Sequence, residues 1–437
     1  MSVTLITVLL FASLVILLLT GFPLAFCMGG LAALFTLLLW SPEALSMISS
    51  VAYGLMDNFI LTAIPLFIFM GTVLQSSGIA EDAYEMMYKW IGNIKGGLAI
   101  GTVGICTIFA ACTGVSAAAT VAMGVIALPA MLSRRYDKSI AVGCISAGGS
   151  LGILIPPSVL MIVYGVFASE SIGRLFAGGV LPGLLLASLF IIYIALRSWL
   201  QPHMGPPIPP EERPTWKERF VSLKGMILPL LLIFSVLGTI FKGVCTPTEA
   251  AAIGSLGSLL CAAIHRKLSW KVIKEACYST QRLSCMVGWI ILGGMCFSSL
   301  YTAIGALDFI KETVSALPVS PYLILVGMQF SLLVLGMILD PGGIIMITTP
   351  IYIPVIKMLG FDPVWFGVLF TVNMEMGYLT PPFGFNLFYM KSIAPNDISM
   401  GDIYRSIIPF VGLQIVCLVI LILFPEIVLW LPDLLFR

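Results

Sequence analysis

The stretch Gly152-Ile-Leu-Ile-Pro-Pro157 has a counterpart 225 residues further along the chain, Gly377-Tyr-Leu-Thr-Pro-Pro382. Two other pairs keep the same spacing: Pro129 with Pro354, and Asp137 with Asp362. Because one offset holds over the whole stretch, we interpret the chain as two related halves, 1–200 and 225–437. A proline-rich and charged stretch at 201–224 separates them and is typical of a linker.

The composition places both halves in lipid. Of 437 residues, 59% are hydrophobic and only 10% are charged, whereas about 25% are charged in an average soluble domain. Since a helix needs about 20 apolar residues to cross the hydrocarbon layer, apolar runs such as 3–19, 226–240 and 407–424 predict membrane spans. The net charge of +1 does not indicate a nucleic-acid-binding surface. We find no zinc-like His/Cys spacing and no GxxxxGK phosphate loop, so we expect no nucleic acid, ATP or organic cofactor.

Both halves show the same order of segments. The first half has predicted spans at 3–20, 24–39 and 59–76, an amphipathic arm at 81–95, two short apolar segments within about 98–132, an interrupted span at about 139–168 and a span at 175–196. The second half has spans at 226–240, 248–264 and 284–301, an arm at about 307–315, paired segments within about 322–359, an interrupted span at about 365–393 and a last span from 407. The paired segments are too closely joined for two full crossings, so each pair predicts a re-entrant hairpin.

A hairpin adds no crossing, so each half crosses the membrane five times and the second half is inverted relative to the first. The sequence therefore predicts an all-α polytopic membrane protein, an inverted repeat with two re-entrant hairpins and two broken helices, as in secondary transporters. This topology puts Arg174, Lys242, Lys311, Lys357 and Arg437 on one face and the other 17 of the 22 Lys and Arg residues on the opposite face. The basic face is cytoplasmic by the positive-inside rule, so we expect both termini outside.

The hairpin tips and helix breaks are the candidate binding sites. Backbone that leaves its helix within a membrane is tolerated only beside protein or a water-lined cavity. The predicted tips are Thr113-Gly114-Val115-Ser116 and Leu339-Asp-Pro-Gly-Gly343, and the predicted breaks are 146–157 and 373–382. Hydroxyl and carbonyl oxygens are ligands that sodium takes, glycine lets an ion approach the backbone, and helix N-termini beyond a break attract a carboxylate.

We predict about two sodium sites and one substrate site. The candidate sodium ligands are Thr113, Gly114, Ser116, Ser146, Gly148 and Ser150 in the first half, and Asp340, Gly342, Asn373, Gly377 and Thr380 in the second. The candidate substrate-binding residues are Pro156, Pro157, Pro381, Pro382, Asn386 and Glu375. Three alternatives stay open: the small residues allow close helix packing, Asp340 caps the second helix of its hairpin, or Glu375 pairs with a distant arginine.

Three motifs carry a resemblance to a known family. Ser150-Leu-Gly-Ile-Leu-Ile-Pro-Pro-Ser158, Leu339-Asp-Pro-Gly-Gly343 and Glu375-Met-Gly-Tyr-Leu-Thr-Pro-Pro-Phe-Gly-Phe-Asn-Leu-Phe388 resemble the large, DctM-type membrane subunit of tripartite ATP-independent periplasmic (TRAP) transporters. The resemblance extends over essentially the whole chain. It implies a bacterial inner-membrane location, an elevator-type moving domain, sodium coupling, and two separate partners: a small four-helix membrane subunit and a periplasmic substrate-binding protein. It also implies a small organic acid as substrate, of the sialic acid or C4-dicarboxylate type.

Two other functions are weighed against this one. A stand-alone divalent-anion and sodium symporter would share the architecture and need no binding protein. A membrane-embedded enzyme would need paired catalytic side chains, such as Ser/His or Asp/Asp on facing helices. The sequence shows no such pair, so we expect a transporter rather than an enzyme.

Overall fold

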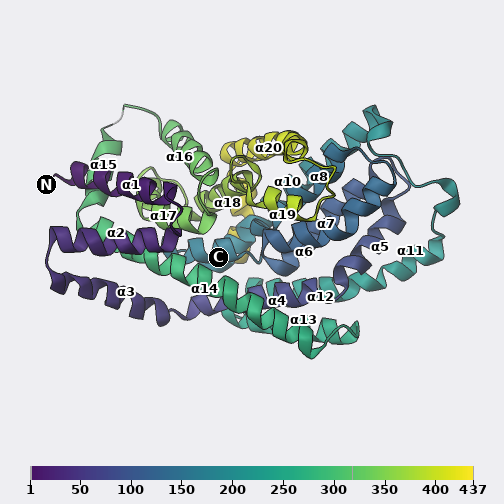
Figure 1. The fold of residues 1–437 in the computed structure, drawn as a ribbon, viewed down its shortest axis with the longest axis horizontal. Coiled ribbons are helices and arrows are strands. Elements are labelled where there is room, and N and C mark those ends of the chain that lie inside the picture. Colours follow the sequence, from purple (N-terminus) through teal and green to yellow (C-terminus); the bar gives the residue numbers. More distant parts are fainter. Residues whose placement is uncertain (1, 317, 437) are drawn as a thin grey trace.

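A computed structural model describes residues 2–316 and 318–436, and these residues form a bundle of helices without strands (Figure 1). The first half consists of α1 (Val3–Leu19), α2 (Leu24–Leu39), α3 (Ser46–Met56), α4 (Ala63–Gln75), α5 (Ile79–Ile91), α6 (Gly97–Thr113), α7 (Ser116–Ser133), α8 (Lys138–Ser150), α9 (Val159–Ala168) and α10 (Ile172–Leu200). The second half consists of α11 (Trp216–Ser222), α12 (Lys224–Phe241), α13 (Pro247–Ile264), α14 (Trp270–Ala303), α15 (Ala306–Ser315), α16 (Pro321–Gly336), α17 (Pro341–Met358), α18 (Pro363–Leu379), α19 (Phe385–Ile393), α20 (Met400–Leu423) and α21 (Glu426–Leu435). The predicted all-α fold class is confirmed.

Seven of the described helices are long and apolar enough to cross a membrane: α7, α10, α11 with α12, α13, α14, α17 and α20. An eighth follows if the bent pair α3 and α4 is one span. α6 and α7 are joined by two residues and pack against each other, and α16 and α17 are joined by four residues and also pack against each other. Both predicted helical hairpins are therefore present, and the chain is a multi-pass membrane protein.

The third span of each half is longer than predicted. In the second half it is one helix of 34 residues, so Lys271 and Lys274 lie on α14 rather than in a loop. In the first half the equivalent segment is split into two helical parts that meet at 57°. Asn58 accepts a hydrogen bond from the Ile60 amide there, and Pro65 in the first turn of α4 has no amide hydrogen to donate. A new helix therefore starts at this point.

Both helix breaks are shorter than predicted, which corrects the expectation that they begin at Ser146 and Asn373. Ser146, Gly148 and Ser150 all lie within α8, and the chain leaves the helix only after Ser150. Residues 373–379 are helical in α18, and that break covers 380–384. A proline disturbs the backbone next to it and just before it, whereas the buried surroundings keep the glycine-containing turns helical.

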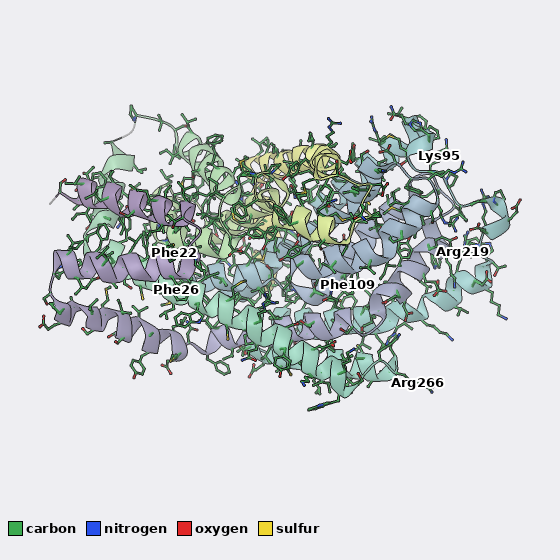
Figure 2. All side chains as sticks on the ribbon, viewed as in Figure 1. Phe22, Phe26, Lys95, Phe109, Arg219 and Arg266 are labelled. Atoms are coloured by element: carbon green, nitrogen blue, oxygen red, sulfur yellow. The ribbon has the colours of Figure 1, made fainter. Side chains whose placement is uncertain are left out.

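Ion pairs join the two halves at both ends of the broken helices. At one end the Lys138 ammonium lies 2.6 Å from Asp397, and that ammonium holds the pKa of the Asp397 carboxyl below its usual value. At the other end Arg174 lies 3.6 Å from Asp362, and Lys357 lies 3.1 Å from Glu170. Lys95, Arg219 and Arg266 gather at the right end in Figure 2, whereas α1 and α15 lie at the left end in Figure 1. These three basic residues therefore lie far from α1 and α15.

The molecule has a buried core and an outer layer that exposes apolar side chains. Helices α6 to α10 and α16 to α20 supply most of the largest fully buried side chains, including Trp365, Phe190 and Phe410. The Trp365 indole donates to the Leu421 carbonyl at 2.9 Å. The outer helices α1 to α3, α12 and α13 instead expose side chains such as Met56, which is 82% exposed, and Phe234. The hairpins and the broken helices therefore belong to one packed unit.

Candidate functional site

The tip of the first hairpin packs directly on the break in its own half. Gly114 joins α6 to α7 with a φ of +64°, and a Cβ there would lie 2.4 Å from the Pro157 carbonyl oxygen. The Gly114 carbonyl accepts a hydrogen bond from the Val159 amide at 3.5 Å. On the other side of the break, a Cβ on Gly152 would lie 3.1 Å from the Ser116 Cα. Tip and break are therefore in contact.

Behind this contact three polar groups form a cluster that crosses between the halves. The Ser116 hydroxyl donates to Asn386 Oδ1 at 2.7 Å, and Asn386 Nδ2 donates to the Ser146 carbonyl at 3.2 Å. All three residues are at most 1% exposed. The hydroxyl oxygens of Ser146 and Thr120 have no hydrogen-bond partner among the described residues. Asn386, predicted as a substrate ligand, thus lies among the first-half candidates for sodium.

Ser150 and Glu375 meet a residue that the sequence analysis missed. Gln414 Nε2 donates to the Ser150 hydroxyl at 3.3 Å. Glu375 is fully buried, and neither of its oxygens has a partner of good hydrogen-bond geometry among the described residues, although the Gln414 side chain lies near enough to interact. The predicted pairing of Glu375 with an arginine is absent from the described ion pairs. Gln414 could have been noticed as the one amide side chain in the apolar run 407–424.

The second tip and break are also in contact. The Phe383 amide donates to the Met337 carbonyl at 3.2 Å. A Cβ on Gly377 would lie 3.0 Å from the Gly336 Cα, so α16 and α18 approach at their backbones. Thr380 lies at the start of this break, where its hydroxyl donates to the Met376 carbonyl.

Asn373 binds a second residue that the sequence analysis missed. Its Nδ2 donates to the Gln329 backbone carbonyl at 2.7 Å and to Gln329 Oε1 at 2.9 Å. Asn373 Oδ1 has no hydrogen-bond partner among the described residues. Gln329 is the one amide side chain in the apolar helix α16, so the same signal that marks Gln414 could have found it.

Two glycine candidates are better explained by packing. A Cβ on Gly148 would lie 3.0 Å from Cys106 Cβ, and Gly377 faces Gly336 as described above. Both glycines lie within helices, so their carbonyls are in position for intrahelical hydrogen bonds. These contacts favour the close-packing alternative for Gly148 and Gly377.

A cavity of about 600 Å³ opens between the two tips and the helices α2, α4 and α14. The first residues of four core helices line it: Ser116 of α7, Val159 of α9, Pro341 of α17 and Phe385 of α19. Ser158 caps α9 and Asp340 caps α17, whereas α7 and α19 have no side-chain cap. Helix N-termini carry partial positive charge. The cavity is therefore suited to receive a carboxylate.

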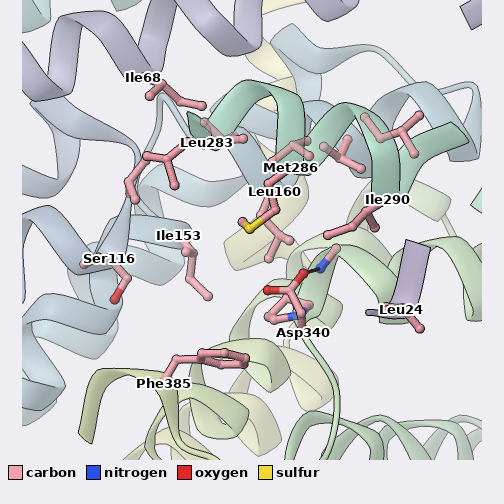
Figure 3. Close-up of a pocket in the computed structure, with 18 of the residues that line it drawn as sticks. Leu24, Ile68, Ser116, Ile153, Leu160, Leu283, Met286, Ile290, Asp340 and Phe385 are labelled. Carbon is pink, nitrogen blue, oxygen red and sulfur yellow. Dashed lines mark hydrogen bonds between the residues drawn. The ribbon is translucent and has the colours of Figure 1, made fainter. Parts of the chain in front are cut away.

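Asp340 both caps a helix and lines the cavity. Its Oδ2 accepts a hydrogen bond from the Gly342 amide at 2.9 Å, as the capping alternative predicts. The residue also lines the cavity together with Gly342 (Figure 3). Capping and a place at the cavity wall are therefore compatible.

The remaining candidates lie away from this cavity. Pro156 and Pro157 are buried in the core, and Pro381 and Pro382 are exposed; none of the four is among the described residues that line the cavity. These prolines therefore shape the breaks without lining the cavity. Thr113 faces a second cavity of about 230 Å³ together with Thr72, Gln75 and Ser279.

Comparisons with known proteins agree on one family. A family model described as "Tripartite ATP-independent periplasmic transporter, DctM component" matches residues 11–427. The C4-dicarboxylate TRAP transporter large permease protein DctM of Vibrio cholerae is 34% identical over 98% of this chain and 97% of its own. The ectoine TRAP transporter large permease protein TeaC of Halomonas elongata is 33% identical over 86% of this chain and 87% of its own. The crystal structure of the Alcanivorax borkumensis YdaH transporter shares the fold, with a TM-score of 0.67, 14% identity and coverage of 92% of this chain and 96% of that one.

Proposed function

The chain belongs to the DctM component family of tripartite ATP-independent periplasmic transporters, and from this premise we propose that it imports a small organic acid across the bacterial inner membrane, driven by sodium. It is a large permease subunit, and family membership implies a small membrane subunit and a periplasmic binding protein as partners. We propose the sialic acid or C4-dicarboxylate type of acid, delivered by the binding protein.

The observation that carries this proposal is the meeting of four helix N-termini at one cavity between two hairpin tips. A carboxylate at the uncapped ends of α7 and α19 would accept hydrogen bonds from backbone amides and lie at the positive end of each helix dipole. In transporters with inverted repeats, substrate and ion sites lie together where the two repeats meet. The large cavity is therefore the proposed substrate site.

Buried oxygens without partners support two sodium sites. In the first half, the hydroxyl oxygens of Ser146 and Thr120 remain free to receive an ion beside Ser116. In the second half, Asn373 Oδ1 remains free, and Asp340 and Thr380 lie at the second tip and break. An unsatisfied buried oxygen costs about 1–3 kcal/mol, and a bound cation would remove that cost. Thr113, Gly114, Ser150 and Gly342 complete the proposed set.

The two-part architecture supports an elevator-type movement. The core holds both hairpins and both broken helices, and its halves are tied together at both ends by Lys138 with Asp397 and by Arg174 with Asp362. The outer helices expose apolar side chains suited to lipid or to the small subunit. We propose that the core moves as one body past the outer helices and carries the cavity from one face to the other.

Uptake into proteoliposomes tests this function. The large subunit reconstituted with its small subunit should accumulate substrate only with an inward sodium gradient and the binding protein, and ATP should have no effect. Uptake that persists in sodium-free buffer would contradict the coupling. Uptake without the binding protein would instead favour the stand-alone symporter.

Impermeant thiol reagents test the orientation in the same vesicles. A cysteine that replaces Lys138 should react only from the cytoplasmic face, and one that replaces Lys311 only from the periplasmic face, where both termini are expected. Labelling of both cysteines from one face would contradict the inverted repeat.

A further inference from the structure

A second, smaller cavity lies beside the proposed substrate site. Its volume is about 230 Å³, and it is bounded by the first hairpin and by the helices α4 and α14. Four residues line both cavities: Ile68, Val115, Ala117 and Leu283. The two spaces are therefore neighbours, with Ile68 and Leu283 on their common edge (Figure 3).

The small cavity follows three helices in one direction. Successive turns of each helix line it: Ile68, Thr72 and Gln75 on α4, Ala117 and Val121 on α7, and Leu283 and Ser279 on α14. Residues three or four positions apart lie on one face of a helix. In the proposed orientation α4 and α7 end, and α14 begins, toward the cytoplasmic face. The small cavity therefore lies on the cytoplasmic side of the large one.

The free polar groups of this space belong to α4 and α14. The side chains of Gln75 and Ser279 have no hydrogen-bond partner among the described residues. The Thr72 and Thr113 hydroxyls donate to carbonyls of their own helices, at 2.8 and 3.0 Å. A carboxylate accepts hydrogen bonds only, so the Gln75 amide and the Ser279 hydroxyl are the donors available to it.

The composition of the small cavity favours brief binding of an acid. None of the described residues that line it is Lys, Arg or His. Neutral donors bind a carboxylate more weakly than cationic side chains do. The side chains of Ile68 and Leu283 offer no hydrogen bond at the edge between the two cavities. An acid would therefore rest on either side of this edge and not on it.

We propose that the small cavity is a release site for the transported acid. Gln75 and Ser279 hold the carboxylate after it has left the large cavity and before it enters the cytoplasm, and Ile68 and Leu283 separate the two sites. The helices α4 and α14 hold neither a tip nor a break, and through this site they act directly on transport. This inference rests on the proposed function, which supplies the acid and the direction of movement.

A bulky side chain tests whether the acid passes through the small cavity. Ser279→Trp fills the space, so uptake of succinate or sialic acid into proteoliposomes should be lost. Binding of the same acids and of sodium to the purified large and small subunits should be unchanged by calorimetry. Cys277→Trp is the matched control and should keep uptake, because Cys277 is exposed and lies on the opposite side of α14. Uptake by Ser279→Trp at the unmodified rate overturns the inference, and so does equal loss in both variants.

Thiol labelling tests the same site without a bulky residue. In a chain with Cys277→Ser and Cys285→Ser, which removes the two exposed cysteines, the Ser279→Cys variant should react with a charged, impermeant thiol reagent from the cytoplasmic face only. Succinate or sialic acid should slow this reaction. Reaction with a membrane-permeant maleimide alone would show that lipid fills the space and overturns the inference. Labelling from the periplasmic face, or labelling that neither acid slows, also overturns it.

The polar groups are tested by a variant that keeps the space open. Gln75→Leu removes one donor, so the maximal rate of uptake should fall about tenfold while the substrate affinity of the large cavity is kept. An unchanged maximal rate overturns the role of Gln75. If Ser279→Trp blocks an uptake that needs no sodium, the proposed function fails and the inference stands. If sodium-driven uptake is intact in Ser279→Trp, the inference fails and the proposed function stands.

Discussion

The two tip-and-break pairs have the same backbone plan and different side chains. In the first pair the prolines Pro156 and Pro157 are buried, and hydroxyl and amide groups bind across to the other half through Asn386. In the second pair Pro381 and Pro382 are exposed, and the acidic residues lie there. Ser150 in the first half and Glu375 in the second occupy equivalent positions at the 225-residue offset. The two pairs therefore share a backbone frame and differ in the chemistry of their side chains.

The largest expected effect concerns the first tip. Gly114→Ala should reduce uptake more than tenfold, because the new Cβ would lie 2.4 Å from the Pro157 carbonyl oxygen and separate tip from break. Gly360→Ala is the matched control: it also has a positive φ, of +79°, but no atom lies within 4 Å of its Cβ. The control should lose only about 1 kcal/mol of stability. Equal loss of uptake in both variants would show that backbone strain at a positive φ, and not the contact with Pro157, causes the loss.

Replacement of the two buried amide residues, Asn386 and Asn373, should have different effects on stability and on the sodium requirement. Asn386→Ala removes hydrogen bonds between the halves and leaves the Ser116 hydroxyl unpaired, so we expect a loss of about 1–3 kcal/mol of stability together with a higher sodium requirement. Asn373→Ala removes bonds within the second half and should mainly raise the sodium concentration needed for half-maximal uptake. Both quantities are measured on the same purified proteins, by thermal unfolding and by uptake. Unchanged sodium dependence in both variants would mean that the ions bind elsewhere.

The smallest expected effect concerns Glu375. Its carboxyl group is fully buried, with no partner of good geometry among the described residues, and an ionised carboxylate that is buried without a partner destabilises the folded protein. Glu375→Gln should therefore raise the melting temperature in sodium-free buffer, whereas Glu426→Gln on the exposed start of α21 should not. A lower melting temperature for Glu375→Gln would reveal a stabilising partner for the carboxylate.

The repeat made much of the frame predictable. Prolines and glycines at a constant offset marked both breaks, and the order of segments followed from apolar run lengths. The predicted extent of the breaks was wrong because a glycine destabilises a helix by only about 1 kcal/mol. The buried packing around Gly148 overcomes this cost. Local sequence therefore predicted where the two helices are interrupted, but not how many residues each interruption covers.

The polar contacts behind the tips could not be predicted, because they join residues far apart in the chain. Ser116 meets Asn386, and Ser150 meets Gln414, only after the two halves have packed. The lining of the large cavity could not be predicted for the same reason, since Phe26 and Trp289 come from α2 and α14 while Tyr378 comes from α18. A single sequence shows each of these residues as an ordinary member of an apolar run.

Sodium at the two tips should order one cavity for the substrate, and linkage between sodium and substrate binding measures this coupling. Binding of substrate to the purified large and small subunits is measured by calorimetry in sodium buffer and in potassium buffer, and binding of sodium is measured with and without substrate. Each ligand should tighten the binding of the other by the same factor, and this factor should shrink in Asn373→Ala. Substrate affinity that is equal in sodium and in potassium would contradict it.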